Sequence, residues 1–357
     1  MAQRRIRFCP FRALAPVALS FLLAAPVALA AEENVFLYFA IQKSTGDNAI
    51  ARSDLDGNNL EELVQVTDDL VFGVSVNPES GYLFYTTGNI SPNSSTVWRA
   101  SVKGEDPEVV YNFDSHPDLP GTPTGRITGI EALGGDDRQL LWLDTAVDYL
   151  YSGEESGEVD AIPALEFPNG EYYYLVVDTV NDVGYVFDYT HSDLYKVTPE
   201  PTLSYALVTL DGDPLSNPSA IALDVDSQVL YWGQTGANSG IWRVKANGGT
   251  GAEQIHEGSY SSNQGGLSLD LEAGMAYWAD YNLRRIWRGA MDGSGDVETV
   301  LTLASGTGPK GVTVVDLPEP DPRLGALAGL ALLALFCERR RLGEATERKA
   351  ARATLPR

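Results

Sequence analysis

The sequence predicts an all-β fold, a six-bladed β-propeller, over residues 31–317. Three observations support this prediction: an apolar and aromatic strand recurs six times at a nearly constant spacing, other short strands recur at fixed places around it, and turn residues lie between the strands. A period of about 46 residues built from four short strands is typical of propeller blades. Helical periodicity of useful length does not appear in this range.

The most regular strand of the repeat has an aromatic residue near its centre. Successive aromatic positions are 46, 57, 45, 45 and 46 residues apart, a spacing that chance rarely maintains. We take the following residues as equivalent: Phe39, Tyr85, Trp142, Phe187, Trp232 and Trp278. Each of them marks one blade.

Further strands accompany most copies. The preceding strand ends in a polar residue, and in the later copies these residues lie 46 positions apart: Asp178, Asp224, Asp270 and Asp316. The following strand carries a basic residue: Arg52, Arg99, Lys196, Arg243 and Arg288. A turn such as Asp292-Gly293 and a fourth short strand, as at 298–303, complete the unit.

The two ends of the repeat region predict how the ring closes. The first copy begins at Leu37 and lacks a preceding inner strand, whereas residues 311–316 form an inner strand without a blade of their own. Open sheet edges invite pairing with other chains, so a stable ring needs every blade complete. We therefore expect strand 311–316 to pair with the N-terminal blade, 35–67.

The last copy carries the fullest motif. It reads Tyr277-Trp278-Ala279-Asp280, with a Gly-Leu-x-Leu-Asp strand before it and Ile286 and Arg288 after it. This pattern resembles the YWTD β-propeller of low-density-lipoprotein-receptor type, over essentially all of 35–316. The third copy is degenerate, and other copies lose the final Asp, as at Thr87 and Gln234.

This resemblance implies that the repeated residues brace neighbouring blades and take no part in catalysis. We expect that structural role for Trp142, Trp232, Trp278, Asp178, Asp224, Asp270, Asp280 and Asp316. A residue type that is present in every blade rarely forms a single active site.

Residues 1–30 have the features of a cleavable signal peptide. They begin with four Arg, continue with an apolar run, and end in Ala28-Leu29-Ala30, a small-x-small cleavage site. The run is interrupted by Pro16 and Pro26 and is short for a membrane span. We therefore expect the chain to be exported.

Residues 318–341 have the features of a sorting signal. They comprise Pro318-Glu319-Pro320, an apolar stretch at 324–337 that predicts a short transmembrane helix, and Arg339-Arg340-Arg341, which is expected to stay in the cytosol with the tail 342–357. This order resembles the PEP-CTERM signal of Gram-negative bacteria. The resemblance implies an exosortase-type processing enzyme as a partner, a transient stay in the inner membrane, and delivery to the cell surface or the exopolysaccharide matrix. A plain C-terminal anchor is the alternative.

Charge and cysteine content exclude several classes of function. Residues 31–317 hold 13 Lys and Arg against 44 Asp and Glu, a net charge of −31. Such a field repels phosphate backbones, so nucleic acid is excluded as a partner, and the membrane is contacted only through the C-terminal helix. Cys9 and Cys337 both lie in the terminal segments, which rules out a disulfide scaffold and a cysteine enzyme.

The sequence offers few candidates for catalytic chemistry. His116, His191 and His256 stand in three different blades, and no metal-ligand spacing or nucleophile motif occurs. We therefore predict no catalytic residue, no metal site and no cofactor, with calcium left open. The acidic run 54–59 alternates oxygen ligands but lacks the Glu that completes a calcium loop.

Two irregular stretches interrupt the repeat on either side of the third aromatic strand, at 113–126 and 153–171. Insertions on a regular scaffold are where binding surfaces tend to lie. We therefore predict a binding surface on the loops of the third blade, formed by His116, Asp118, Glu154, Glu155, Glu158 and Asp160.

These features favour a non-enzymatic protein of the cell surface or matrix that binds an extracellular protein or polysaccharide. The alternative is an exported calcium-dependent hydrolase or lactonase, because six-bladed propellers also host such enzymes. That alternative requires unlike ligands from several blades around one metal, whereas the sequence mainly repeats like residues in each copy. A purely structural matrix component is the third hypothesis, since fold does not decide function.

Overall fold

The computed structural model describes eleven stretches of the chain: 34–88, 95–112, 127–133, 139–145, 148–157, 164–198, 204–210, 215–236, 238–248, 251–258 and 265–318. They form six antiparallel sheets of four strands each. The predicted all-β fold and six-bladed propeller are therefore confirmed. Among these residues, no helix is long and apolar enough to cross a membrane. The predicted helix at 324–337 lies outside them.

Apart from the C-terminal β24, the strands of the first three blades follow one another in the sequence. From the innermost strand to the outermost, blade one is β24 (Thr307–Asp316), β1 (Val35–Lys43), β2 (Asp47–Asp54) and β3 (Glu61–Thr67). Blade two is β4 (Leu70–Asn77), β5 (Tyr82–Gly88), β6 (Thr96–Ser101) and β7 (Glu108–Asn112). Blade three is β8 (Ile127–Leu133), β9 (Gln139–Asp144), β10 (Tyr149–Glu154) and β11 (Ala164–Glu166).

The second half of the ring repeats this order. Blade four is β12 (Tyr172–Asp178), β13 (Val183–Asp188), β14 (Asp193–Thr198) and β15 (Ser204–Val208). Blade five is β16 (Pro218–Asp224), β17 (Val229–Gln234), β18 (Gly240–Lys245) and β19 (Glu253–Glu257). Blade six is β20 (Leu267–Asp270), β21 (Met275–Asp280), β22 (Arg285–Ala290) and β23 (Glu298–Thr302).

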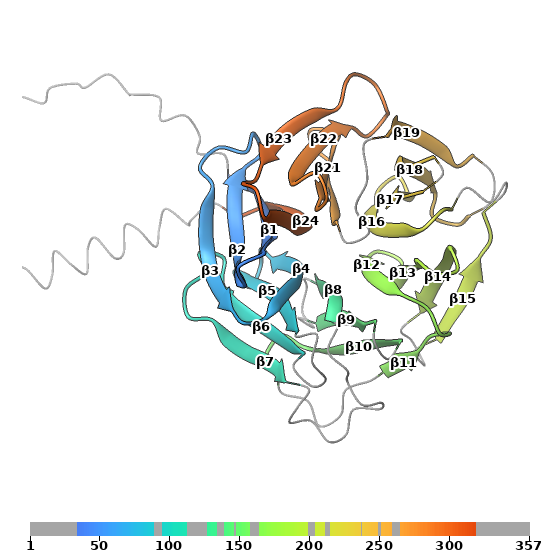
Figure 1. Ribbon diagram of the computed structural model, residues 1–357. Helices are drawn as coiled ribbons and strands as arrows, with labels where there is room; N and C mark the ends of the chain where they lie inside the picture. Colours follow the sequence, from blue (N-terminus) through green and yellow to red (C-terminus); the bar gives the residue numbers. More distant parts are fainter. Residues whose placement is uncertain are drawn as a thin grey trace, which may run out of the picture. The chain divides into compact units, whose positions relative to one another are not determined.

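The C-terminal strand closes the ring. β24 pairs with β1 along its whole length, from Val35 opposite Asp316 to Lys43 opposite Thr307. The predicted closure by 311–316 is confirmed, and the strand extends four residues further toward the N-terminus than predicted. The innermost strands contact one another in the order β24, β4, β8, β12, β16, β20 and back to β24. These strands surround the centre of the ring (Figure 1).

The strand register corrects one of the predicted equivalences. Tyr231 pairs with Arg243 and Tyr185 pairs with Lys196, so Val186, and not Phe187, occupies the place of Trp232. Both Val186 and Phe187 are buried. The position is buried and apolar but does not always hold an aromatic ring, which is why the aromatic marker of this blade is wrong by one residue.

The core lies between the blades. Trp142, Trp232 and Trp278 have no exposed surface and belong to three separate clusters. In blade five, Trp232 also stacks on Trp242 of the neighbouring strand at 6.0 Å between ring centroids. Such aromatic pairs contribute about 0.5–1.5 kcal/mol beyond the burial of their area.

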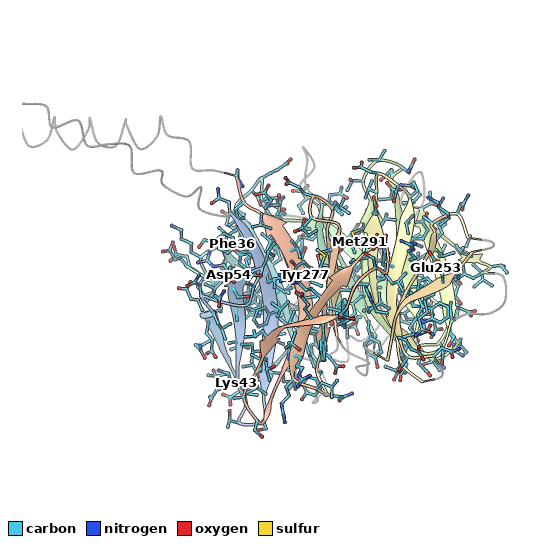
Figure 2. All side chains as sticks on the ribbon, turned by 90° about the horizontal axis from the view of Figure 1, so that it is seen from above. Phe36, Lys43, Asp54, Glu253, Tyr277 and Met291 are labelled. Carbon is cyan, nitrogen blue, oxygen red and sulfur yellow. The ribbon has the colours of Figure 1, made fainter. Side chains whose placement is uncertain are left out.

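Strand direction divides the propeller into two faces. The connections from the first to the second strand and from the third to the fourth lie on one face, which we call the turn face. The remaining connections, including those between blades, lie on the opposite loop face. Figure 2 shows this division in blade one, with Phe36 and Asp54 toward the turn face and Lys43 toward the loop face. Both ends of the ring lie on the turn face, where the Leu317 amide donates to the Asn34 carbonyl at 2.9 Å.

Candidate functional site

The repeated basic residues of the third strands hold the blades together internally. In four blades, an Arg on the third strand lies directly opposite a Glu on the fourth, and the two side chains form an ion pair. The pairs are Arg52–Glu61 at 2.9 Å, Arg99–Glu108 at 2.7 Å, Arg243–Glu253 and Arg288–Glu298 at 2.8 Å. Antiparallel register places such pairs side by side on one face of the sheet.

The same Arg side chains also reach the next blade. Arg288 Nη1 donates to Asp56 Oδ1 in blade one at 2.7 Å. Arg243 Nη1 donates to the Met291 carbonyl in blade six at 2.8 Å, and Arg99 Nη1 donates to the Glu155 carbonyl in blade three at 2.6 Å. The planar guanidinium has enough donors for a carboxylate and a neighbouring turn at once. These residues are therefore placed where they join neighbouring blades.

The repeated Asp residues lie at turns. Asp224 and Asp270 accept a hydrogen bond from the backbone amide three residues later, each at 2.9 Å, and Asp280 does the same at 3.0 Å. The buried Asp178 accepts four hydrogen bonds, two from backbone amides and two from side-chain amides. Asp316 lies one residue beyond the equivalent position, which is occupied by Val315 opposite Phe36.

Two of the six predicted binding residues can be placed. Glu154 is exposed at the end of β10, while Glu155 is 3% exposed and accepts a 2.6 Å hydrogen bond from Asn77 Nδ2 of blade two. Glu155 therefore contributes to the contact between blades two and three. His116, Asp118, Glu158 and Asp160 lie outside the described residues.

The strands that flank the two irregular stretches enter them from opposite faces. β7 ends at Asn112 and β8 begins at Ile127 on the loop face, whereas β10 ends at Glu154 on the turn face. β12 begins at Tyr172 on the loop face, so the second stretch connects the turn face with the loop face. Of the sorting residues, Pro318 is exposed at the end of the described chain, and Glu319, Pro320, Arg339, Arg340 and Arg341 lie beyond it.

A tyrosine crosses the centre of the ring. The Tyr174 hydroxyl on β12 accepts a hydrogen bond of 3.2 Å from the Gly311 amide on β24, and these strands belong to opposite blades. The strand register gives each innermost strand a position equivalent to Tyr174. In four of the other five strands this position is a glycine: Gly73, Gly129, Gly266 and Gly311. A Cβ at Gly73, Gly129 or Gly266 would meet the backbone of the next blade within 3.0 Å. Small residues therefore let the strands approach, and the half-buried Tyr174 side chain reaches across the space between them.

Two charged residues lie on innermost strands near these glycines, one toward the turn face and one toward the loop face. The Glu131 carboxyl on β8 accepts a 3.4 Å hydrogen bond from Ser75 Oγ on β4, and burial raises its pKa to about 7. Lys310 on β24 is 3% exposed and its ammonium lies 4.7 Å from the Phe72 ring and 5.3 Å from the Tyr281 ring. A lysine between aromatic faces is stabilised by cation–π attraction.

Blade four departs from the Arg and Glu pattern. Lys196 stands where the other blades have Arg, and Ala206 lies opposite it where they have Glu. In the described part of the chain, the Lys196 ammonium makes no ion pair and no hydrogen bond. A lysine also lacks the fork of donors with which an arginine spans two partners.

A pocket of about 450 Å³ lies at this place, between blades four and five at the turn face. It is lined by Asn181, Val183, Tyr185, Lys196, Gln228, Lys245 and Asn247, a set without any carboxylate. The Lys245 ammonium donates to the Ser227 carbonyl at 2.9 Å and is otherwise exposed. A second pocket, of about 270 Å³, lies between blades one and two, with Tyr85 and Trp98 in its wall and Asp69 as its charged residue.

The two pocket lysines were not predicted as a site. By its spacing, Lys196 is one more member of the repeated basic series. A signal was present in the sequence, because Lys replaces Arg in this copy alone among the five, but the missing Glu becomes visible only once the register places Ala206 opposite.

The histidines that can be placed serve in local contacts. His191 Nδ1 lies 2.7 Å from Asp188 Oδ2, and this hydrogen bond raises the pKa of the half-exposed imidazole. His256 Nε2 lies 2.9 Å from the Ala290 carbonyl while burial lowers its pKa. Across the residues that the structure places, no group of three or more His, Cys, Asp or Glu side chains is arranged to hold a metal ion.

No family model matches this chain. Solved structures with the same fold include a chain of a nidogen/laminin complex, which is 18% identical with a TM-score of 0.63 and aligns over 78% of this chain and 98% of that one. TolB from Acinetobacter baumannii is 12% identical with a TM-score of 0.57, over 78% and 66%. A catalytically inactive virginiamycin B lyase from Staphylococcus aureus with quinupristin is 14% identical with a TM-score of 0.52, over 80% and 94%. These propellers differ in function, so the likeness establishes the fold alone.

Proposed function

We propose that the protein is an exported, non-enzymatic β-propeller of the cell surface or matrix that binds an extracellular protein or polysaccharide. The observation that carries this proposal is the use of the repeated charged residues. Arg99, Arg243 and Arg288 each contact a Glu of their own blade and a turn of the next, and the Tyr174 hydroxyl contacts β24 across the centre of the ring. The repeated charged residues are thus used in contacts within and between blades. The pockets and loops of the surface remain for recognition of a partner.

The sequence supports the export and sorting part of the proposal. Residues 1–30 have the order of a signal peptide, and 318–341 have the order of a PEP-CTERM signal. The end of β24 and the start of β1 lie together on the turn face, so the chain leaves the ring beside the point where it enters. A C-terminal segment can therefore be removed or attached without passing through the ring.

Location in the native bacterium tests this part directly. Cells carrying the natural chain are compared with cells in which Pro318, Glu319 and Pro320 are each replaced by alanine. The natural protein is expected at the cell surface or in the matrix fraction, and the variant in the inner membrane. Equal distribution of the two proteins, or a natural protein that stays in the cytosol, would contradict the proposed sorting.

A calcium and substrate screen tests the non-enzymatic part. The purified protein is incubated with lactone and ester substrates, with calcium and after chelation. We expect no turnover above the buffer rate in either condition. Turnover that depends on calcium and scales with protein concentration would establish the hydrolase alternative instead.

A further inference from the structure

The pocket between blades four and five is locally cationic in a strongly acidic domain. Residues 31–317 contain 13 Lys and Arg, and two of them, Lys196 and Lys245, line this one pocket without any carboxylate in its wall. Elsewhere the equivalent basic residue faces a Glu at hydrogen-bond distance. The carboxylate of Asp178 lies behind this wall, bonded to the Asn181 and Gln228 amides, but among the described residues neither lysine ammonium pairs with a carboxylate.

The amide groups of the pocket have a defined orientation. Gln228 donates through Nε2 to Asp178 Oδ2 and to the Val225 carbonyl, at 2.7 and 2.8 Å. Asn181 Nδ2 also donates to Asp178 Oδ2, at 2.7 Å. Because their NH₂ groups are held by Asp178, the carbonyl oxygens of both amides remain as hydrogen-bond acceptors. A ligand that satisfies them must bring hydroxyl or other donor groups.

These two properties define a class of ligand. Two ammonium groups favour a carboxylate, and amide oxygens favour hydroxyl groups on the same molecule. The volume of about 450 Å³ lies in the range that holds small organic ligands. The net charge of −31 repels anions at long range, but salt screens that field over about 8 to 10 Å, while direct contacts in a partly buried pocket are screened much less.

We propose that this pocket binds the uronate sugars of an acidic polysaccharide. Lys196 and Lys245 contact the sugar carboxylate, and the amide oxygens of Asn181 and Gln228 accept hydrogen bonds from its hydroxyl groups. The inference rests on the proposed function, because it names the polysaccharide class and the place where an exported propeller would bind it.

Calorimetric titration of the full-length protein with trigalacturonate tests this proposal. The same trisaccharide with its carboxyl groups reduced to alcohols is the neutral control, and a short polyglutamate peptide tests acidic peptides. We expect saturable binding of trigalacturonate and a loss of about tenfold or more in affinity for the reduced sugar. Equal binding of the two sugars, tighter binding of polyglutamate, or no binding of trigalacturonate would each overturn the assignment.

The A206E variant supplies the sharpest test of the site. It places a Glu opposite Lys196, as in the four blades with an ion pair, and is therefore expected to preserve the fold while neutralising Lys196. Affinity for trigalacturonate should fall about tenfold or more in A206E and also in K196Q and K245Q. K103Q, which removes an exposed lysine from the turn face of blade two, is the matched control and should bind as the natural protein does.

The variants also separate this inference from the proposed function. Undiminished trigalacturonate binding in A206E and K196Q, with both proteins folded by their melting curves, would place the sugar elsewhere and overturn the pocket assignment while a binding function survives. Absence of the protein from the cell surface, or turnover of lactones, would contradict the proposed function regardless of what the pocket binds.

Discussion

At the scale of single residues, Glu131 is a half-buried carboxyl on the innermost strand β8 whose titration should affect stability. Its pKa rises from 4.5 to about 7 because burial between innermost strands disfavours the charged form, while the Ser75 hydroxyl lowers it only in part. The folded state therefore binds this proton more tightly than the unfolded state does. Its stabilising effect is complete below about pH 4.5 and is lost as the pH rises through about 7.

Replacement of this carboxyl should remove that pH dependence. We expect E131Q to melt a few degrees above the natural protein at pH 8, corresponding to about 1–3 kcal/mol, and to melt close to it at pH 4. Thermal melts of both proteins from pH 4 to 8 measure this difference. E272Q, at an exposed turn of blade six, is the control. A constant difference between E131Q and the natural protein across the range would show that Glu131 ionises as an ordinary surface group.

Tyr174 allows a second prediction at this scale. Y174F removes one hydrogen bond to the Gly311 amide and should cost about 1 kcal/mol, whereas Y174A also removes the packing of this half-buried ring and should cost about 2–4 kcal/mol. Denaturant unfolding of the two variants measures both values. If the two variants lose the same stability, the Tyr174 ring does not pack against the innermost strands.

At the scale of elements, the closing strand β24 should control the stability of the whole ring. It supplies the innermost strand of blade one and contacts β4 and β20 of the two neighbouring blades. A chain that stops at residue 306 loses this strand and exposes the edge of β1. We expect it to lose the cooperative melting transition of a chain that stops at residue 317. Indistinguishable melting curves would contradict closure by β24.

The element scale also shows what the sequence could predict and why. Repeated strands, the turns between them and the closing strand could all be predicted, because a propeller repeats one pattern of burial in every blade. The equivalence of Phe187 was wrong because the buried position in blade four is filled by Val186, so residue type alone did not fix the register. Register is set by pairing with the next strand, and this pairing also shifts at a bulge in several blades.

The candidate site could not be predicted from the sequence, because it too depends on the strand register. Lys196 belongs to the basic series by its spacing, and only its partner across the strand pair distinguishes it from Arg243 or Arg288. The pocket arises from residues of two blades that are distant in sequence, such as Asn181 and Asn247. Sequence patterns within one copy carry no information about such a junction.

At the scale of the whole molecule, the propeller combines a strongly negative net charge with one pocket that is lined by lysines. The net charge of residues 31–317 repels polyanions at long range, a repulsion that salt screens, while the pocket between blades four and five presents two lysines at the turn face. Binding of an acidic polysaccharide through this pocket should therefore depend on short-range contacts with the sugar carboxylates and not on long-range attraction. We expect the selectivity for uronate over neutral sugar to persist at 0.15 M salt, about physiological ionic strength.

Retention of the protein by an immobilised acidic polysaccharide tests the central claim most directly. The purified protein is applied to immobilised polygalacturonate before and after chemical reduction of its carboxyl groups. We predict retention on the native polysaccharide, release by free trigalacturonate, and little retention on the reduced polymer. Equal retention on both polymers, or none on the native one, would contradict a surface propeller that binds acidic sugar through the pocket between blades four and five.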